Sequence, residues 1–246
     1  MVLEYIKKGW ESYKSNFMSF IIAELIALIV VGIILLIGSV TIFTTMGISP
    51  FTELRSPVIT ISRIVPISSL FLNFSVLLAF YLVASLIGAF FIIGLFSMAA
   101  ETLRGATEFR TMFTAIKEFG VTGILTSVIV WLIAMFFIFI VVGVLGLVFP
   151  VIGSVIGAIL FLLIMVFFSL SYSGIVIDNL GPIETIQRSI KITKKNYPDV
   201  FGLLLFYTGI SFALNFIPFI GQIIIYFMLV PMFFISLVFF YKRNRF

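Results

Sequence analysis

Six long apolar runs constrain the fold of this chain more than any other feature. Each has about 18 residues or more, close to the length at which an α-helix crosses a bilayer, and a helix satisfies its own backbone hydrogen bonds there. The runs are Phe17–Met46, Leu70–Ala100, Val121–Val148, Val151–Ile177, Val200–Ile217 and Ile220–Tyr241. They predict an all-α fold, a polytopic membrane bundle of six transmembrane helices.

The composition supports the same class. The chain has 246 residues, of which 62% are hydrophobic and 10% are charged. Soluble domains are roughly 45–50% apolar and about 25% charged, so one soluble core could not hide this much apolar surface. The first apolar run is longer than that of a cleavable signal and has no cleavage motif, so we expect this span to be retained. We expect a single membrane domain over 1–246.

Basic residues mark alternate connections between the runs. Of the 15 Lys and Arg residues, 13 lie before the first run, between runs two and three, between runs four and five, or after the last run. The exceptions, Arg55 and Arg63, follow the first run. The positive-inside rule therefore predicts a multi-pass protein of the cell membrane with cytoplasmic N- and C-termini. The basic balance indicates membrane lipids as partners and not nucleic acid.

A basic segment with helical period precedes three of the runs. In Ile183–Tyr197 the apolar positions are spaced by three and four residues, which predicts a helix with one apolar stripe. The stripe consists of Ile183, Ile186, Ile190, Thr193 and Tyr197. The equivalent residues 180 positions earlier are Leu3, Ile6, Trp10, Tyr13 and Phe17. Those in the middle of the chain are Ala106, Phe109, Phe113, Ile116 and Gly120. Lys14, Lys117 and Lys194 share one position in this alignment.

We therefore predict three pseudo-repeated hairpins, each preceded by a basic amphipathic helix. The repeats are 1–103, 104–180 and 181–246. Two similar outer turns, Phe149–Gly153 and Ile217–Gly221, support the pattern. The first outer connection is longer, roughly Gly47–Ser69, and its alternating residues fit a strand or a short interfacial helix equally well.

The basic helices have two interpretations. They could lie at the membrane surface and bind lipid phosphate, since each surface Lys or Arg gains about 1 kcal/mol from anionic headgroups. Alternatively, the stripes pack on neighbouring helices and the lysines only set the topology. The headgroup candidates are Lys14, Lys117, Lys194, Arg188 and Lys195.

Polar residues inside the apolar runs form a predicted layer near the inner third of the membrane. Glu24 is well inside the first run, on the side of Phe20 and Ala27 if the helix is straight, and a carboxylate there costs roughly 2.5 kcal/mol or more. The layer comprises Glu24, Ser127, Ser169, Tyr172, Ser173 and Thr208. The structural alternative is that the hydroxyls serve helix packing and that Glu24 is protonated or reaches toward a Lys partner. Pro231 predicts a kink in the last span.

Catalytic chemistry has little support. The chain has no cysteine and no histidine, and no nucleotide-binding, metalloprotease or serine-hydrolase motif. We therefore expect no catalytic residue, no metal site, no cofactor and no enzymatic activity.

One local motif carries a family resemblance. Residues 177–189, read IDNLGPIETIQRS, are followed by Lys194-Lys195-Asn196-Tyr197. This stretch resembles prokaryotic, chiefly archaeal, membrane-domain families related to the membrane portion of glycerophosphodiester phosphodiesterases. The resemblance implies a similar helical membrane fold and an association with lipid. The catalytic domain of those enzymes is missing from this chain, so no catalytic role is implied.

Three functions fit the sequence. The leading hypothesis is a protein that binds or transports a lipid or another amphiphile, with Lys14, Lys117 and Lys194 at the phosphate. The second is an ion or proton pathway through the Glu24 layer. The third is a membrane scaffold whose amphipathic segments, including Trp10, recruit a soluble partner. A monomer and a homo-oligomer are both compatible with the pattern.

Overall fold

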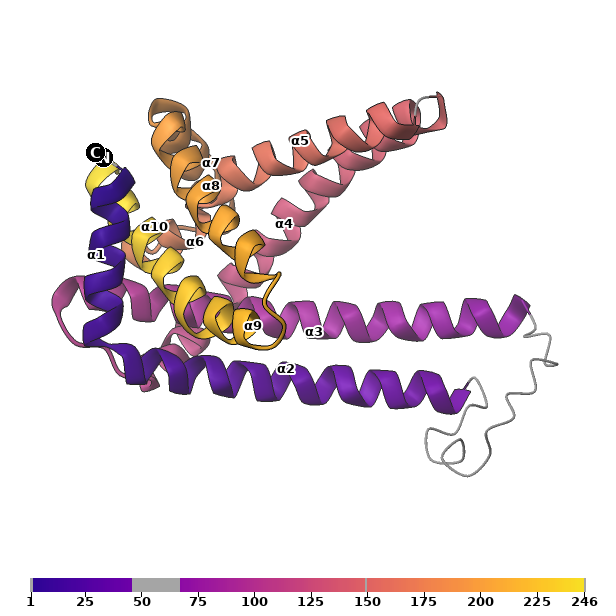
Figure 1. Cartoon of the computed structure of the whole chain (residues 1–246), viewed down its shortest axis with the longest axis horizontal. Coiled ribbons are helices and arrows are strands. Elements are labelled where there is room, and N and C mark those ends of the chain that lie inside the picture. Colours follow the sequence, from indigo (N-terminus) through magenta and orange to yellow (C-terminus); the bar gives the residue numbers. More distant parts are fainter. Residues whose placement is uncertain (1, 46–66, 149, 246) are drawn as a thin grey trace. The chain divides into compact units, whose positions relative to one another are not determined.

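The structure is a computed structural model that describes residues 2–45, 67–148 and 150–245. Every regular element in these residues is helical, as predicted (Figure 1). The helices are α1 (Val2–Ser15), α2 (Phe17–Thr45), α3 (Ile67–Glu101), α4 (Arg110–Val148), α5 (Pro150–Phe168), α6 (Ser171–Asp178), α7 (Pro182–Lys195), α8 (Tyr197–Leu214), α9 (Ile220–Ile224) and α10 (Val230–Asn244). A 3-10 turn, Thr102–Arg104, follows α3, and a π-helical segment, Ile225–Leu229, joins α9 to α10.

Six described stretches are long and apolar enough to cross a membrane, which confirms the predicted number. They are Phe17–Thr41, Leu82–Arg104, Arg110–Phe137, Val151–Asp178, Tyr197–Leu214 and Ile220–Asn244. Three of them are not single α-helices. The second ends in the 3-10 turn Thr102–Arg104. The fourth is interrupted between α5 and α6, and the sixth contains the π-helical segment directly before Val230 and Pro231. A wider turn there accommodates a proline, which has no N–H to donate to the preceding turn.

The chain divides into two compact units. One comprises Met1–Glu24 and Ala89–Phe246, and we call it the main unit. The other, Leu25–Gly88, contains the remainder of α2 and α3. Within it the two helices approach closely at Gly38, where a Cβ atom would lie 2.8 Å from Cγ of Phe80. The first outer connection and the start of the predicted Phe149–Gly153 turn lie outside the described residues.

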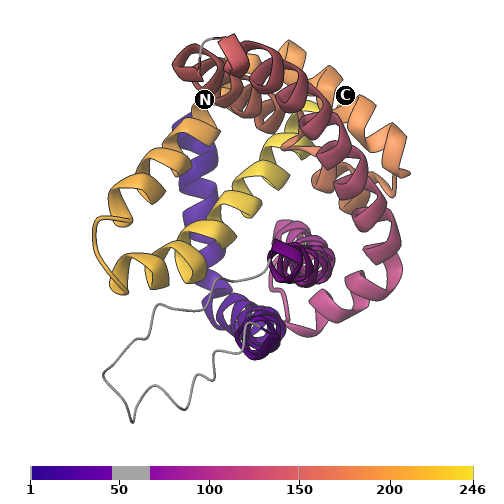
Figure 2. The ribbon, with the colours of Figure 1, turned by 90° about the vertical axis from the view of Figure 1, so that its right-hand side faces the viewer.

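In the main unit, α1 packs on α10, which brings the first and the last helix of the chain together (Figure 1, Figure 2). The Tyr13 hydroxyl donates to the Phe227 carbonyl at 2.6 Å, and the Ser236 hydroxyl donates to the Tyr5 carbonyl at 3.2 Å. Arg243 and Glu4 form an ion pair at 2.7 Å near the chain ends. The buried face of α1 consists of Tyr5, Gly9 and Tyr13.

This buried face differs from the predicted apolar stripe of α1. Leu3, Trp10 and Phe17 are 77%, 42% and 47% exposed, and only Tyr13 of the stripe is fully packed. The reason is that small or hydrogen-bonding residues let helices approach closely, while large apolar side chains are also stable against lipid. The stripe of α1 is therefore mostly exposed, which agrees with the surface interpretation and not with the alternative in which the stripe packs on neighbouring helices.

Helix α7 packs on α5 and α6 through a row of hydroxyl side chains. Thr185 donates to the Ser171 carbonyl, Ser189 donates to the Phe167 carbonyl at 2.7 Å, and Thr193 is also buried. Successive members of this row are four residues apart, so they lie on one helix face. The neighbouring Ile183 is 63% exposed. The packed face of α7 therefore overlaps the predicted stripe at Ile186 and Thr193 but does not include Ile183.

The junctions after α1 and α7 have the same local geometry. Asn16 ends α1 and its N–H donates to Tyr13 O at 3.0 Å; Asn196 ends α7 and its N–H donates to Thr193 O at 3.1 Å. Both asparagine side chains donate to a carbonyl four residues earlier. Each following helix starts one residue later. The predicted middle helix behaves differently, because from Arg110 its residues belong to α4, which runs on to Val148 without a break.

Candidate functional site

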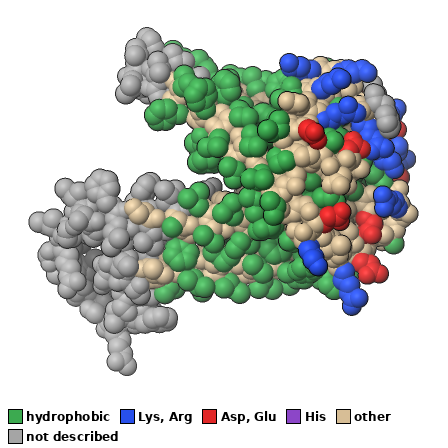
Figure 3. Space-filling model, turned by 180° about the vertical axis from the view of Figure 1, so that it is seen from behind, with side chains coloured by type: hydrophobic (Ala, Val, Ile, Leu, Met, Phe, Trp, Pro, Cys, Tyr) green, Lys and Arg blue, Asp and Glu red, His purple; other side chains and the backbone are tan. Residues whose placement is uncertain are grey.

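The charged side chains of the main unit gather at one end, here called the charged end. In the view of Figure 3, Lys, Arg, Asp and Glu side chains cluster there, whereas hydrophobic side chains dominate the rest of the described surface. The five predicted headgroup residues come from three helices. Lys14 (α1), Lys117 (α4), and Lys194 and Lys195 (α7) are exposed, and Arg188 (α7) is half-buried.

Lys194 lies at an apolar groove of about 270 Å³, which we call the α7 groove. Helices α4 and α5 supply most of its walls, and α7 adds Ile190 and Lys194. Its other lining residues are Ile133, Phe137, Leu160, Leu163, Ile164, Phe167 and Phe168. A groove with hydrocarbon walls and one ammonium group fits an acyl chain with an anionic headgroup.

Arg188 lines a different, polar pocket of about 490 Å³ on the other side of α7. It shares this pocket with Lys191 and two carboxylates, Asp178 and Glu184. Glu184 also accepts a hydrogen bond from the N–H of Gly181 at 3.3 Å, at the start of α7. Acidic and basic groups are mixed here, so this pocket favours anions less than the predicted lysine cluster implied.

The structure joins two residues of the predicted polar layer. The hydroxyls of Ser127 (α4) and Tyr172 (α6) share a short hydrogen bond, and the Tyr172 ring stacks on Phe96 with a centroid separation of 5.3 Å. Ser127 also donates to Gly123 O, four residues earlier on its own helix, at 2.8 Å. This contact fixes the start of α6 against α4.

The other layer residues have separate surroundings. Ser169 donates to Val166 O at 2.9 Å on its own helix, and Thr208 is exposed on α8. Ser173 is fully buried, and its hydroxyl has no hydrogen-bond partner within the described residues. No hydrogen bond of the described residues joins these three hydroxyls to Ser127 or Tyr172.

Glu24 is the most deeply buried carboxylate of the described residues. It is 8% exposed and lies on the buried side of α2 with Phe20 and Ala27, as the spacing predicts. Its Oε1 has no hydrogen-bond partner in the described part of the chain. Burial, with a smaller contribution from the nearby Glu24, raises the pKa of Tyr13 to about 12. Tyr13 therefore stays a hydrogen-bond donor to Phe227 O over the physiological range.

The ends of α1 and α10 are joined electrostatically. Hydrogen bonds from Arg243 and then from Lys8 lower the pKa of Glu4. The Lys8–Glu4 separation is 3.4 Å, and all three side chains are about half exposed. Solvent screens pairs of this kind, so they orient the chain ends more than they stabilise them.

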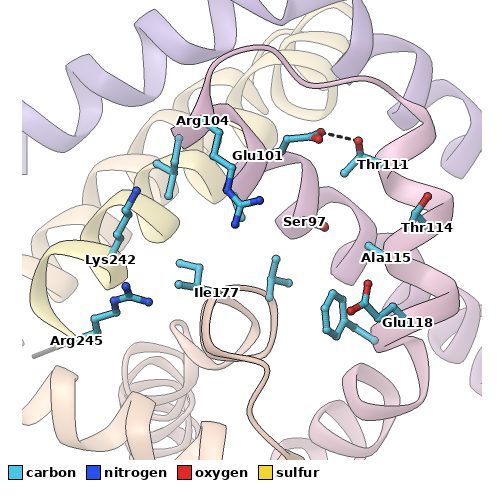
Figure 4. Close-up of a pocket in the computed structure, with 14 residues that line it drawn as sticks. Ser97, Glu101, Arg104, Thr111, Thr114, Ala115, Glu118, Ile177, Lys242 and Arg245 are labelled. Carbon is cyan, nitrogen blue, oxygen red and sulfur yellow. Dashed lines mark hydrogen bonds between the residues drawn. The ribbon is translucent and has the colours of Figure 1, made fainter.

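One further cavity was not predicted. It has a volume of about 630 Å³ and opens at the charged end, and we call it the charged cavity (Figure 4). Its basic residues are Arg104, Lys242 and Arg245, which the sequence assigned only to membrane topology. They come from the 3-10 turn and from the C-terminal end of the chain, about 140 residues apart in sequence. No local motif could have brought them together.

No metal site is apparent in the described residues, where no three His, Cys, Asp or Glu side chains cluster. No family model, no curated protein and no solved structure matches the chain. The resemblance around Gly181 therefore stays a prediction. The fold and the six apolar helices define a class: the chain is compatible with a multi-pass integral membrane protein.

Proposed function

We propose that this protein is a non-enzymatic integral membrane protein that binds a lipid or another amphiphile in the α7 groove. The main observation that supports this proposal is the composition of the groove, whose walls are hydrocarbon and whose single charged lining residue is Lys194. The acyl chain would lie between α4 and α5. The headgroup phosphate would contact the Lys194 ammonium. The resemblance of residues 177–197 to lipid-related membrane domains agrees with this proposal.

The position of Lys194 favours a defined contact over a diffuse one. The hydrogen bonds of Thr185 and Ser189 fix α7 on the two helices before it. Thr193, beside Lys194, is fully buried. The lysine therefore projects from a helix whose position and rotation are set.

The headgroup of the lipid, and not its acyl chain, would provide the selectivity among lipids. An acyl chain gains little by leaving the bilayer for an apolar groove, because lipid tails are as apolar as leucine. A surface lysine gains about 1 kcal/mol from an anionic lipid. We therefore expect about fivefold preference for anionic over zwitterionic lipid at this groove.

Native mass spectrometry of the chain released from nanodiscs tests the proposal, using equal amounts of phosphatidylglycerol and phosphatidylcholine. Lys194→Gln is expected to reduce bound phosphatidylglycerol, and Lys195→Gln is the matched control, since Lys195 is exposed on the same helix but does not line the groove. The triple change of Lys14, Lys117 and Lys194 to Gln extends the test. Unchanged lipid binding in that variant would reject the proposal.

We also propose that both chain ends are cytoplasmic. The supporting observation is that the 13 basic residues of the sequence-based assignment lie on one side of the six spans. Because the chain contains no cysteine, single cysteines are specific probes. A cysteine at Ser15 should be labelled by an impermeant maleimide only after the cells are opened, and one at Phe216 should be labelled in intact cells. The reverse pattern would overturn this orientation.

An internal repeat is the third part of the proposal. The bounds of α1 and α7 differ by 180 residues at both ends, and so do the starts of α2 and α8. The packed faces correspond in the same register, with Gly9 matching Ser189 and Tyr13 matching Thr193. Repeats of the same orientation are related by an axis along the membrane normal. The middle copy, 104–180, has weaker support because α4 has no equivalent break.

The buried Glu24 favours a second candidate function, an ion or proton pathway. A carboxylate with an unpartnered oxygen inside a span is a functional-site candidate, since its burial is costly. Liposome flux that collapses in Glu24→Gln would support the pathway. Flux indifferent to that change, or no flux in the wild type, would remove this candidate.

A further inference from the structure

We propose that the charged cavity binds a phosphate group, through Arg104 and Lys242 with help from Arg245. This site goes beyond the proposed function, since it shares no lining residue with the α7 groove. The phosphate could belong to a soluble phosphate ester or to a lipid headgroup. The chemistry is the same in both cases, and the test below separates the two sources.

The cavity has the size of a ligand site and is built from five elements. Its volume of about 630 Å³ lies within the usual range of small-molecule pockets, roughly 300–1,000 Å³. The end of α3 and the 3-10 turn form one side, the first turns of α4 a second, and α6 and the end of α10 the remainder. Figure 4 shows Arg104 and Arg245 directed toward the middle of the cavity, Lys242 on the same side as Arg245, and Glu118 on the opposite side.

Charge in the cavity is unevenly compensated. The Oε2 atom of Glu101 accepts hydrogen bonds from Thr107 and Thr111, which direct this carboxylate toward Thr111 of α4. Arg245 is paired with Asp178. No ion pair of the described residues involves Arg104 or Lys242. The lining as a whole therefore has three basic groups against two carboxylates, Glu101 and Glu118, and Arg104 and Lys242 are its two basic groups outside the ion pairs of the described residues.

The Arg104 side of the cavity is held in place before any ligand binds. Gly105, which follows Arg104, has φ 131°, a conformation that favours glycine and ends the 3-10 turn. The next loop is fixed at Thr107, whose N–H donates to Asn16 Oδ1 at 2.7 Å and whose carbonyl accepts from Ser19 at 2.8 Å. A preorganised cation loses less freedom on binding than a cation on a free loop.

The Lys242 side is fixed by Asp178 at the end of α6. The Tyr241 hydroxyl donates to Asp178 Oδ2 at 2.8 Å, while Arg245 binds Oδ1. Lys242 lies between these two anchors in the sequence. Arginine presents its N–H groups in a fork that matches phosphate oxygens, and lysine adds a point charge. Apolar residues, among them Phe119, Val176 and Ile177, line the same cavity and suit the organic part of a phosphate ester.

The experiment uses the full chain with Arg104→Gln and Lys242→Gln combined. Calorimetry in detergent with glycerol 3-phosphate probes the soluble source. Native mass spectrometry after nanodisc release, with phosphatidic acid as the probe, tests the lipid source. In at least one arm we expect the wild type to bind and the double variant to bind at least about tenfold more weakly. Lys7→Gln with Arg110→Gln is the matched control, because both residues are exposed and neither lines this cavity.

Two further variants keep the result interpretable. Exchanging the cations, Arg104→Lys with Lys242→Arg, should retain most of the binding and so separates charge from folding. Lys194→Gln should leave phosphate binding at the charged cavity unchanged. An effect of Lys194→Gln on lipid binding would therefore concern only the proposal for the α7 groove. The proposal is overturned if the wild type binds neither probe, or if the double variant and the control lose binding equally.

Discussion

A methyl group added at Gly9 tests the packing of α1 on α10, on which the arrangement of the charged end depends. A Cβ atom at this position would overlap the Ser236 hydroxyl and would lie 3.0 Å from the Met232 carbonyl oxygen. Ordinary contacts of this kind begin at about 3.4 Å. Because the carbonyl belongs to the α10 backbone, the strain can be relieved only by moving Ser236 or by separating the helices.

The expected cost follows from the bonds around Ser236. Its hydroxyl is 2.8 Å from the Tyr207 hydroxyl and 3.2 Å from Tyr5 O, and each broken hydrogen bond costs about 0.5–1.5 kcal/mol. Overpacking adds about 1–3 kcal/mol, and the better helix propensity of alanine returns up to ~1 kcal/mol. We therefore expect Gly9→Ala to lower the free energy of unfolding by about 1–6 kcal/mol, the sum of these contributions.

Gly32→Ala is the matched control. Gly32 is exposed in the middle of α2, and no other atom lies within 4 Å of the position that its Cβ would occupy. This change should stabilise the protein by about 0.5–1 kcal/mol. Titration with sodium dodecyl sulfate, followed by far-UV circular dichroism, measures both variants. Equal unfolding midpoints for the two would refute the packing of α1 on α10 at this glycine.

Three further predictions concern the charged end. In a Trp131→Phe background, Trp10 is the only tryptophan of the chain. Because Trp10 is exposed beside an apolar surface, brominated lipids should quench its fluorescence. Quenching no stronger than that of free tryptophan in solution would contradict this prediction. The pKa of Glu4 is lowered in the folded state, so the ionised Glu4 stabilises the fold above the ordinary carboxyl pKa, and this contribution is lost as pH falls through the lowered pKa. Acidification below about pH 4 should therefore reduce the unfolding midpoint less in Glu4→Gln than in the wild type. Asn16→Ala should lower the free energy of unfolding by about 1–3 kcal/mol more than Asn196→Ala does in the same titration, because only Asn16 also accepts a hydrogen bond from the Thr107 N–H. Equal losses in the two variants would argue against this contact.

The sequence predicts the spans well because the physics of a span is local. An apolar run of sufficient length must form a helix in a bilayer whatever its neighbours are, so the six stretches from Phe17 to Asn244 can be predicted from composition alone. The interruption between α5 and α6 is not predictable in this way. It depends on tertiary contacts, such as the bond between Ser127 and Tyr172, that hydropathy does not contain.

The packed faces of the helices are predicted poorly, for a physical reason. In a soluble protein the apolar side of a helix is the buried side, but next to lipid a large apolar side chain is stable whether it faces lipid or protein. Leu3 and Trp10 are therefore exposed on α1, whereas Gly9 is buried. The signal that could have been used is the spacing of small and hydroxyl residues, which Thr185 and Ser189 illustrate on α7.

The two asparagine junctions differ in whether they contact the loop that follows Arg104 of the charged cavity. Both asparagines interrupt a helix with the same local hydrogen bonds, which position the following span. Only Asn16 also binds a distant loop, through the Thr107 N–H, and that loop directly follows Arg104. Asn196 lacks such a contact among the described residues, and its side chain bonds Ile192 O on its own helix. A shared junction that turns the chain into the membrane therefore has, at one position, the additional role of fixing the basic residue of a polar cavity.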